Sequence, residues 1–302
     1  MKAASFQYEL PEDLNTALQL LNSSDIDVLP LAGGQSLMPM MNFRVSQPDL
    51  LVDLNKIDSL KKIDSDSNSI KIGSMVKYSD MEKSDLIKEK IPLINNVIPF
   101  VAHSAIRNRG TIGGSIALAD PAAEFPSLLV SLDATIELMN IKGTREVKSE
   151  DFFTGIFETD RKTNELVTSI NIPINKSPKK FGFYEITRRH GDYAMAGAFV
   201  TTDGDKKEFS NSRVVLFAVS TKPLRIIDIE VFLNGNLLND VSVQEDAIDI
   251  INGYEFEGDL HNDTEAKKTY AKVSLKRALG ELNGWYQNNH CERKWWSTYK
   301  YN

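Results

Sequence analysis

The sequence predicts a mixed α+β protein of about two domains, on three observations. Its 302 residues exceed the roughly 100 to 200 residues of a single domain. Helical spacing and strand-like alternation interchange through the first part of the chain, whereas the pattern after residue 180 is strand-rich and ends in two helices. Hydrophobic residues make up 41% and charged residues 25%, which is typical of a chain that buries a core.

Composition excludes several classes of function. Lys and Arg total 35 against 42 Asp and Glu, a net charge of −7, so the basic surface that binds nucleic acid is absent. The single cysteine, Cys291, cannot form an intrachain disulfide, and alone it cannot hold an iron–sulfur cluster or a thiolate zinc site. The chain starts without the apolar run of a signal peptide, and Asp133 interrupts one of its most apolar stretches. We therefore expect a cytoplasmic protein without a membrane span and without a metal on this chain.

The first elements follow from local patterns. Pro11 suits a first helical position, and apolar residues repeat at helical spacing behind it, which predicts a helix over 11–22. An apolar run at 28–31, a glycine turn, a short helix and a second apolar run from Leu50 predict strand, turn, helix and strand. The polar residues 61–69 predict a turn or a domain seam.

Further along, Ser79 and Glu82 have the spacing of a capping box, which predicts a helix start. The run NKSPKK at 175–180 is typical of a linker. The other predicted elements are helices over 92–106, from DPAAEFP at 120–126, over 243–252 and over 264–287, and strands around 70–72, 134–138, 167–172 and through 213–220.

Familiar catalytic motifs are absent. The sequence contains neither G-x-G-x-x-G nor G-x-x-x-x-G-K-[ST], so it supports neither a Rossmann dinucleotide site nor a P-loop. H-E-x-x-H and G-x-S-x-G are also missing, and the four histidines are far apart in the sequence. Hydrolase and metalloenzyme chemistry is therefore not indicated.

Two glycine-rich turns remain, AGGQSL at 32–37 and TIGGS at 111–115. A Gly-Gly pair permits positive φ and a close approach to a ligand, and nearby hydroxyl, amide and main-chain N–H groups can donate to phosphate oxygens. Together the two turns could hold a pyrophosphate. For either turn taken alone, an ordinary chain reversal is the favoured interpretation.

With their flanking residues, these turns resemble a known family. LAGGQSLMPMMNFR, AIRNRGTIGGSIALADPAAEFP and, further on, RRHGDYAMAG resemble the FAD-binding medium subunit of the molybdenum hydroxylases, the carbon monoxide dehydrogenase and xanthine dehydrogenase group. The resemblance implies an FAD-binding domain of the vanillyl-alcohol-oxidase type (PCMH), built from two α/β subdomains at 1–58 and 59–175. An antiparallel-sheet and helix domain at 176–302 would follow.

The resemblance also implies which residues bind the cofactor. Glu124 would contact ribityl or ribose hydroxyls, Ala102 would lie near the adenine, and Leu166 would lie near the flavin ring. Asp120 is either a second cofactor contact or a helix cap, and Tyr193 either stacks on the flavin or is a buried tyrosine with a satisfied hydroxyl. The implied contacts are Ala32, Gly33, Gly34, Gln35, Ser36, Leu37, Ala102, Thr111, Ile112, Gly113, Gly114, Ser115, Asp120, Glu124, Leu166 and Tyr193.

The sequence departs from the family at one position. Many members carry a lysine near 184 or 185 that points toward the flavin, whereas this chain has Tyr184 and Glu185. Loss of that cation is expected to lower the flavin potential relative to members with the lysine.

The implied function is electron transfer within a heterotrimer. Substrate would be hydroxylated at molybdopterin on a large subunit, and two [2Fe–2S] clusters on a small subunit would carry the electrons to FAD on this chain, which passes them to an external acceptor. A dimer of such heterotrimers is expected, and no side chain here is assigned a catalytic role. The alternatives are a stand-alone flavin oxidase of the vanillyl-alcohol-oxidase type and an assembly scaffold that has lost its flavin.

Overall fold

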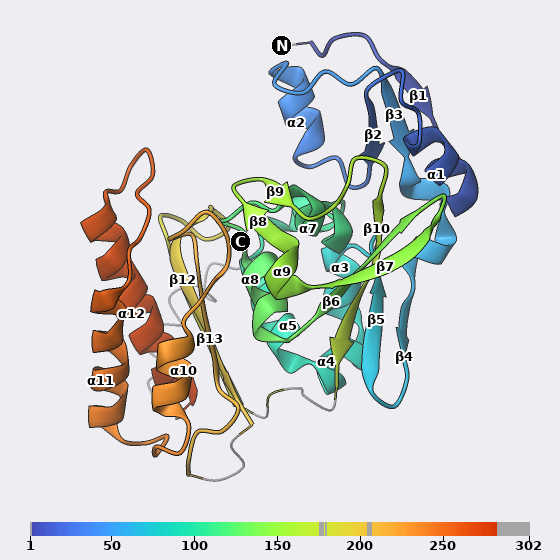
Figure 1. Ribbon diagram of the computed structural model, residues 1–302. Coiled ribbons are helices and arrows are strands. Elements are labelled where there is room, and N and C mark those ends of the chain that lie inside the picture. Colours follow the sequence, from blue (N-terminus) through green and yellow to red (C-terminus); the bar gives the residue numbers. More distant parts are fainter. Residues whose placement is uncertain (1, 175–177, 179, 204–206, 283–302) are drawn as a thin grey trace, which may run out of the picture. The chain divides into compact units, whose positions relative to one another are not determined.

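The computed structural model describes residues 2–174, 178, 180–203 and 207–282 (Figure 1). The chain forms two compact units. The first contains residues 1–177 with two short returns of the chain, Arg189–Tyr193 and Thr221–Pro223, and the second contains the remainder. In the described part of the chain, no helix is long and apolar enough to cross a membrane.

The first unit begins with a small parallel sheet. In spatial order its strands are β1 (Gln7–Glu9), β3 (Leu50–Asp53) and β2 (Val28–Leu31). Helix α1 (Leu14–Leu21) packs its buried face, including Ala17 and Leu18, against the core of this sheet. The helix begins at Leu14 rather than at Pro11, because the Asp13 side chain accepts the Thr16 amide at 2.9 Å and so caps the first turn.

A five-stranded antiparallel sheet forms the centre of the first unit. Its spatial order is β4 (Ile63–Ser65), β5 (Ser69–Gly73), β10 (Leu166–Pro173), β6 (Thr135–Asn140) and β7 (Gly143–Lys148). The turn predicted over 61–69 is present but shorter than expected, because β4 occupies Ile63–Ser65 and only residues 66–68 lie between β4 and β5. The turn itself is short: Asp66 accepts the amides of Asn68 and Ser69, each at 2.7 Å.

Short helices connect β5 to β6, and two predictions about them are wrong. A helix does begin at this point, as α3 from Tyr78, but Lys77 stands at its N-cap position and no side chain caps it, so the capping box of Ser79 and Glu82 is wrong. The Tyr78 amide donates to the Gly110 carbonyl at 3.2 Å. The helix expected over 92–106 is interrupted between Phe100 and Ser104, where Ala102 takes a left-handed φ of 45°. The helices are α3 (Tyr78–Lys83), α4 (Asp85–Lys90), α5 (Pro92–Val97), η3 (Ile98–Phe100), α6 (Ser104–Arg107), α7 (Ile112–Leu118) and α8 (Glu124–Ser131).

Smaller elements complete the first unit. Two short 3-10 helices follow β3, and a helix and a two-stranded hairpin lie between β7 and β10. They are η1 (Leu54–Lys56), η2 (Asp58–Lys61), α9 (Ser149–Phe152), β8 (Phe153–Gly155) and β9 (Glu158–Thr159).

The second unit is an antiparallel sheet with helices covering one of its faces (Figure 1). Its strands in order are β11 (Lys180–Thr187), β12 (Ala194–Thr202), β13 (Arg213–Phe217) and β14 (Leu224–Arg225), and its helices are α10 (Ile227–Leu233), α11 (Val241–Ile250) with η4 (Ile251–Gly253), and α12 (Thr264–Leu282). Helix α10 was not predicted, because seven residues show little periodicity. The end of the helix expected over 264–287, and most of the linker expected over 175–180, lie outside the described residues.

Helix α12 packs closely on β11 and β12. At Gly182 a Cβ atom would lie 1.8 Å from the Ala278 carbonyl oxygen, so the absence of a side chain permits this approach. Lys267, only 3% exposed, reaches from the same helix to the strands. Its ammonium donates to the carbonyls of Met195 at 2.8 Å and Ala218 at 2.7 Å, and pairs with Asp259 at 2.6 Å. Lys267 therefore links the helix to strand β12, to the residue that follows β13 and to the loop before the helix.

We expect Lys267→Met to destabilise the protein, because it leaves two buried carbonyls and one carboxylate without their donor. Each unsatisfied buried acceptor costs about 1–3 kcal/mol. Urea unfolding of the full chain measures the loss, and Lys276→Met, which removes an exposed lysine from the same helix, is the matched control. Equal unfolding midpoints for the two variants would contradict this role of Lys267.

Candidate functional site

The first glycine turn, Ala32–Ser36, connects β2 to helix α2 (Leu37–Asn42). Gly34 has a φ of 71°, a conformation that favours glycine. A Cβ atom at Gly33 would lie 2.2 Å from the carbonyl oxygen of Arg109, which lies two residues before the second turn. Within the described chain, the main-chain N–H groups of Gly34, Gln35 and Ser36 donate no hydrogen bond. This turn therefore offers free donors.

The second turn is bonded more completely to the protein. Thr111 caps α7 by accepting the Gly114 amide at 3.1 Å, and the Gly113 amide donates to the Ser74 carbonyl at 2.9 Å. A Cβ atom at Gly113 would lie 2.4 Å from Cβ of Ser74. The expectation of free amides in both turns is thus met only in the first, and the second turn presents hydroxyl groups instead.

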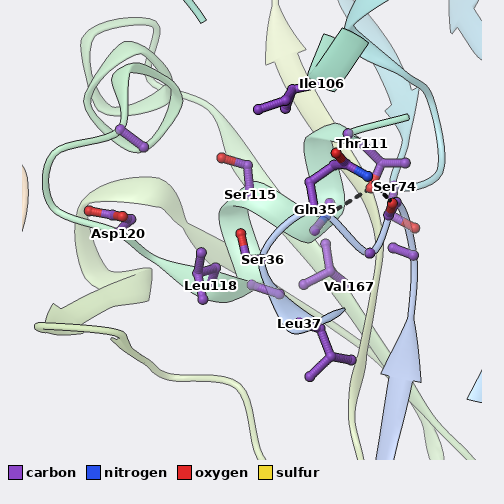
Figure 2. Close-up of a pocket in the computed structure, with 18 of the residues that line it drawn as sticks. Gln35, Ser36, Leu37, Ser74, Ile106, Thr111, Ser115, Leu118, Asp120 and Val167 are labelled. Atoms are coloured by element: carbon purple, nitrogen blue, oxygen red, sulfur yellow. Dashed lines mark hydrogen bonds between the residues drawn. The ribbon is translucent and has the colours of Figure 1, made fainter. Parts of the chain in front are cut away.

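Both turns line one cavity of about 450 Å³ in the first unit. Figure 2 shows side chains of both turns directed into this space. Of the sixteen residues expected to contact a cofactor, Ile112 does not line the cavity, because its side chain is buried in the core. The fifteen that do are Ala32, Gly33, Gly34, Gln35, Ser36, Leu37, Ala102, Thr111, Gly113, Gly114, Ser115, Asp120, Glu124, Leu166 and Tyr193.

On the side of the cavity formed by the second turn, three hydroxyl groups can act as donors. They belong to Thr111, Ser115 and Ser74 (Figure 2). Ser74 is 3% exposed, and its Oγ has no hydrogen-bond partner in the described chain. A buried hydroxyl without a partner is costly unless a ligand or water satisfies it. The orphaned Ser74 Oγ therefore fits a ligand with acceptor oxygens.

An acidic group lies at another part of the cavity. Glu124, at the first position of α8, is 7% exposed, and burial raises its pKa to about 7, with the nearby Asp120 carboxylate adding to the rise. Burial also raises the pKa of Asp120. The Tyr193 ring is 67% exposed, while its hydroxyl approaches Asp120, and withdrawal from water together with that carboxylate raises the pKa of Tyr193.

Asp120 does not cap α8. The residue at the capping position is Ala123, and Asp120 instead accepts the Ala122 amide at 2.9 Å in the loop before the helix. Its carboxylate also lines the cavity. Of the two interpretations that the sequence left open, the helix cap is therefore wrong.

Several lining residues were not predicted. Tyr78 is buried, interacts with Ser115, and stands edge-on to Phe125 with ring centroids 4.8 Å apart. Ser74 and Arg161 also line the cavity. Ser74 lies between a strand and a helix and belongs to no sequence motif. Only its contact with Gly113 in the folded chain identifies it as a residue of the cavity.

The cavity fits a flavin dinucleotide in its chemistry. Free N–H groups and hydroxyls suit a diphosphate, buried carboxylates suit sugar hydroxyls, and apolar side chains suit aromatic rings. Its described lining contains four acidic residues and a single basic one, so an anionic group would be held mainly by neutral donors. The acidic residues are Asp120, Glu124, Glu165 and Asp192.

Comparisons with known proteins agree with this geometry. A family model described as the FAD binding domain in molybdopterin dehydrogenase matches residues 4–175, and one described as the CO dehydrogenase flavoprotein C-terminal domain matches residues 182–282. The chain is 34% identical to the glyceraldehyde dehydrogenase medium chain of Sulfolobus acidocaldarius, over 93% of this chain and 100% of that one.

Solved structures are similar as well. Quinoline 2-oxidoreductase from Pseudomonas putida 86 matches with a TM-score of 0.89 and 32% identity, covering 94% of this chain and 99% of that chain. Carbon monoxide dehydrogenase from Hydrogenophaga pseudoflava, in a form that lacks the Mo-pyranopterin moiety of its cofactor, matches with a TM-score of 0.88, 32% identity and the same coverage. These matches confirm the predicted fold class.

Gly33→Ala is expected to separate the two turns, because its Cβ atom would overlap the Arg109 carbonyl. Overpacking of this kind costs about 1–3 kcal/mol, and the displaced turn should also lose FAD. Thermal unfolding and the FAD content of the purified protein measure the two effects. Gly253→Ala, where a Cβ atom meets no atom within 4 Å, is the control. A stable Gly33→Ala variant with full FAD would show that the turns need not touch.

Glu124 should make the stability of the FAD-free protein depend on pH. Its folded pKa of about 7 lies above the unfolded value, so its contribution is fully present below about pH 4 and is lost as the pH rises through 7. Glu124→Gln removes this titration, so the variant should gain stability relative to the wild type between pH 5 and pH 8, by up to about 3 kcal/mol.

Melting temperatures across that pH range test this expectation. Glu255→Gln, which removes an exposed carboxyl group of the second unit, is the matched control. A constant difference between Glu124→Gln and the wild type from pH 5 to pH 8 would show that Glu124 is ionised throughout.

Proposed function

This chain belongs to the FAD-binding medium subunits of the molybdenum hydroxylase family, and from that premise we propose that it passes electrons from [2Fe–2S] clusters of a partner subunit through FAD to an external acceptor. The observation that carries the proposal is the single cavity lined by both glycine turns. FAD supplies the electron chemistry when bound. The tasks of this chain are to bind the cofactor, orient it and keep part of it accessible.

The residues of the cavity divide these tasks. The free amides of Gly34, Gln35 and Ser36, with the hydroxyls of Thr111 and Ser74, would hold the diphosphate. The proposal also includes the contacts that the family resemblance implies. Glu124 would bind sugar hydroxyls, Ala102 would lie near the adenine and Leu166 near the flavin ring. Electron transfer between centres needs no general acid or base, so no catalytic side chain is assigned here.

The iron–sulfur clusters are proposed to lie on another chain. A cluster needs several thiolates, and this sequence of 302 residues contains one cysteine. One relative named above is a medium chain by its printed name, and one is named for its molybdenum cofactor, which supports a large molybdopterin subunit as a partner. A small [2Fe–2S] subunit completes the proposed complex. We propose a cytoplasmic heterotrimer that dimerises, with domain divisions near 58 and 175.

Purification of the tagged full chain from its own cells tests the function. FAD, iron, sulfide and molybdenum should elute together with two further polypeptides, and the isolated chain with FAD should not be bleached by substrate. Direct bleaching of the isolated chain by an alcohol would favour the stand-alone oxidase. A protein that stays colourless after incubation with FAD would favour the assembly scaffold.

Tyr193 is exposed at the cavity and is the side chain best placed to affect contact with an electron acceptor. We expect Tyr193→Ala to retain FAD and to change the rate at which the reduced flavoprotein is reoxidised. Stopped-flow absorbance of the flavin measures that rate. The same reoxidation rate in Tyr193→Ala and wild type would exclude the role.

A further inference from the structure

Arg161 is the one basic side chain in the described lining of the cavity. It follows the short strand β9 and lies at the edge of the loop that leads into β10. Four acidic side chains share the lining with it, and the charge of Arg161 is opposite to the charge that each of them carries when ionised. A cation in this position needs an explanation.

The carboxylates of Asp160 and Glu165 form ion pairs with Arg145 and not with Arg161, although the nearby charge of Glu165 still acts to raise the pKa of Arg161. Arg145 donates to Oε1 and Oε2 of Glu165 at 2.8 and 2.7 Å, and its guanidinium also pairs with Asp160. The Lys162 amide donates to Glu165 as well, at 2.9 Å. Two acidic side chains beside Arg161 thus have a different partner.

Arg161 itself is fixed to the main chain by one nitrogen. Its Nη1 donates to the carbonyl oxygens of Glu165 at 2.8 Å and Lys162 at 3.0 Å. In the described chain, Nε and Nη2 donate no hydrogen bond, and no carboxylate forms an ion pair with the guanidinium. Burial lowers the pKa of Arg161, yet a guanidinium stays charged at neutral pH.

We propose that Arg161 binds the diphosphate of FAD, with Nη1 holding the side chain in place while its remaining N–H groups donate to the phosphate oxygens. This rests on the proposed function. The flavin, ribityl and adenosine groups are uncharged, so the diphosphate is the part of the cofactor that can neutralise a half-buried cation. Planar guanidinium groups suit phosphate oxygens, with which they form two parallel hydrogen bonds.

FAD titration into the FAD-free full chain tests the proposal. A hydrogen bond to a charged group contributes to the free energy of binding, so Arg161→Met should weaken FAD binding on the order of 10- to 100-fold. The change in flavin fluorescence during the titration measures the affinity. Arg161→Lys should recover part of the affinity, because it restores the charge without the planar donors. Raising the salt concentration should reduce the difference between Arg161→Met and wild type.

Lys162→Met is the matched control, since it removes an exposed positive charge from the next residue, which does not line the cavity. It should bind FAD like the wild type. If the wild type itself binds no FAD, the proposed function fails. If the wild type binds FAD and Arg161→Met has the same affinity, or shifts the absorption spectrum of the flavin with no loss of affinity, Arg161 does not bind the diphosphate.

Discussion

The close approach of two main-chain segments underlies the whole site. Gly33 lies against the Arg109 carbonyl, and Gly113 lies against Ser74, at distances that leave no room for a Cβ atom. These contacts bring two turns to one cavity. One turn follows strand β2 of the parallel sheet, and the other lies among the helices that connect β5 to β6 of the antiparallel sheet. The donor groups of both turns take their places in the lining from that juxtaposition. Glycine is required here mainly for packing between segments, and only Gly34 also needs it for its φ.

The charges of the cavity are unusual for an anion site. Its described lining is predominantly acidic, so neutral N–H and O–H dipoles carry most of the task of holding negative oxygens. Carboxylates close to a cofactor also oppose the addition of electrons to it, and protonation of Glu124 would relieve that opposition. In the proposed binding mode, sugar hydroxyls would gain from the same groups, because an ionised carboxylate accepts two hydrogen bonds. Cofactor binding would then be balanced against the readiness of the cofactor to be reduced.

Sequence reasoning found the elements that depend on local chemistry. The apolar runs of β2 and β3 and the glycine turn between them follow from residue pattern alone, as does α11. It failed where distant contacts decide. The Gly110 carbonyl satisfies the first amide of α3, so the hydroxyl of Ser79 is not needed as a cap. Motif resemblance identified most of the lining, but it could not find Ser74 or Tyr78, which belong to no motif and reach the cavity only through the fold.

The two glycine turns differ in how firmly the protein holds them, and this has a consequence for cofactor exchange. The amides of Ile112, Gly113 and Gly114 are bonded internally, whereas those of Gly34 to Ser36 are not. The second turn is thus the more rigid wall, because its amides already have partners. The first is the more compliant wall: its carbonyls accept hydrogen bonds from the protein, but its amides would gain partners only from a ligand. Release of a tightly held coenzyme should begin with fraying of the compliant side, while the rigid side keeps the binding surface ready for the next molecule.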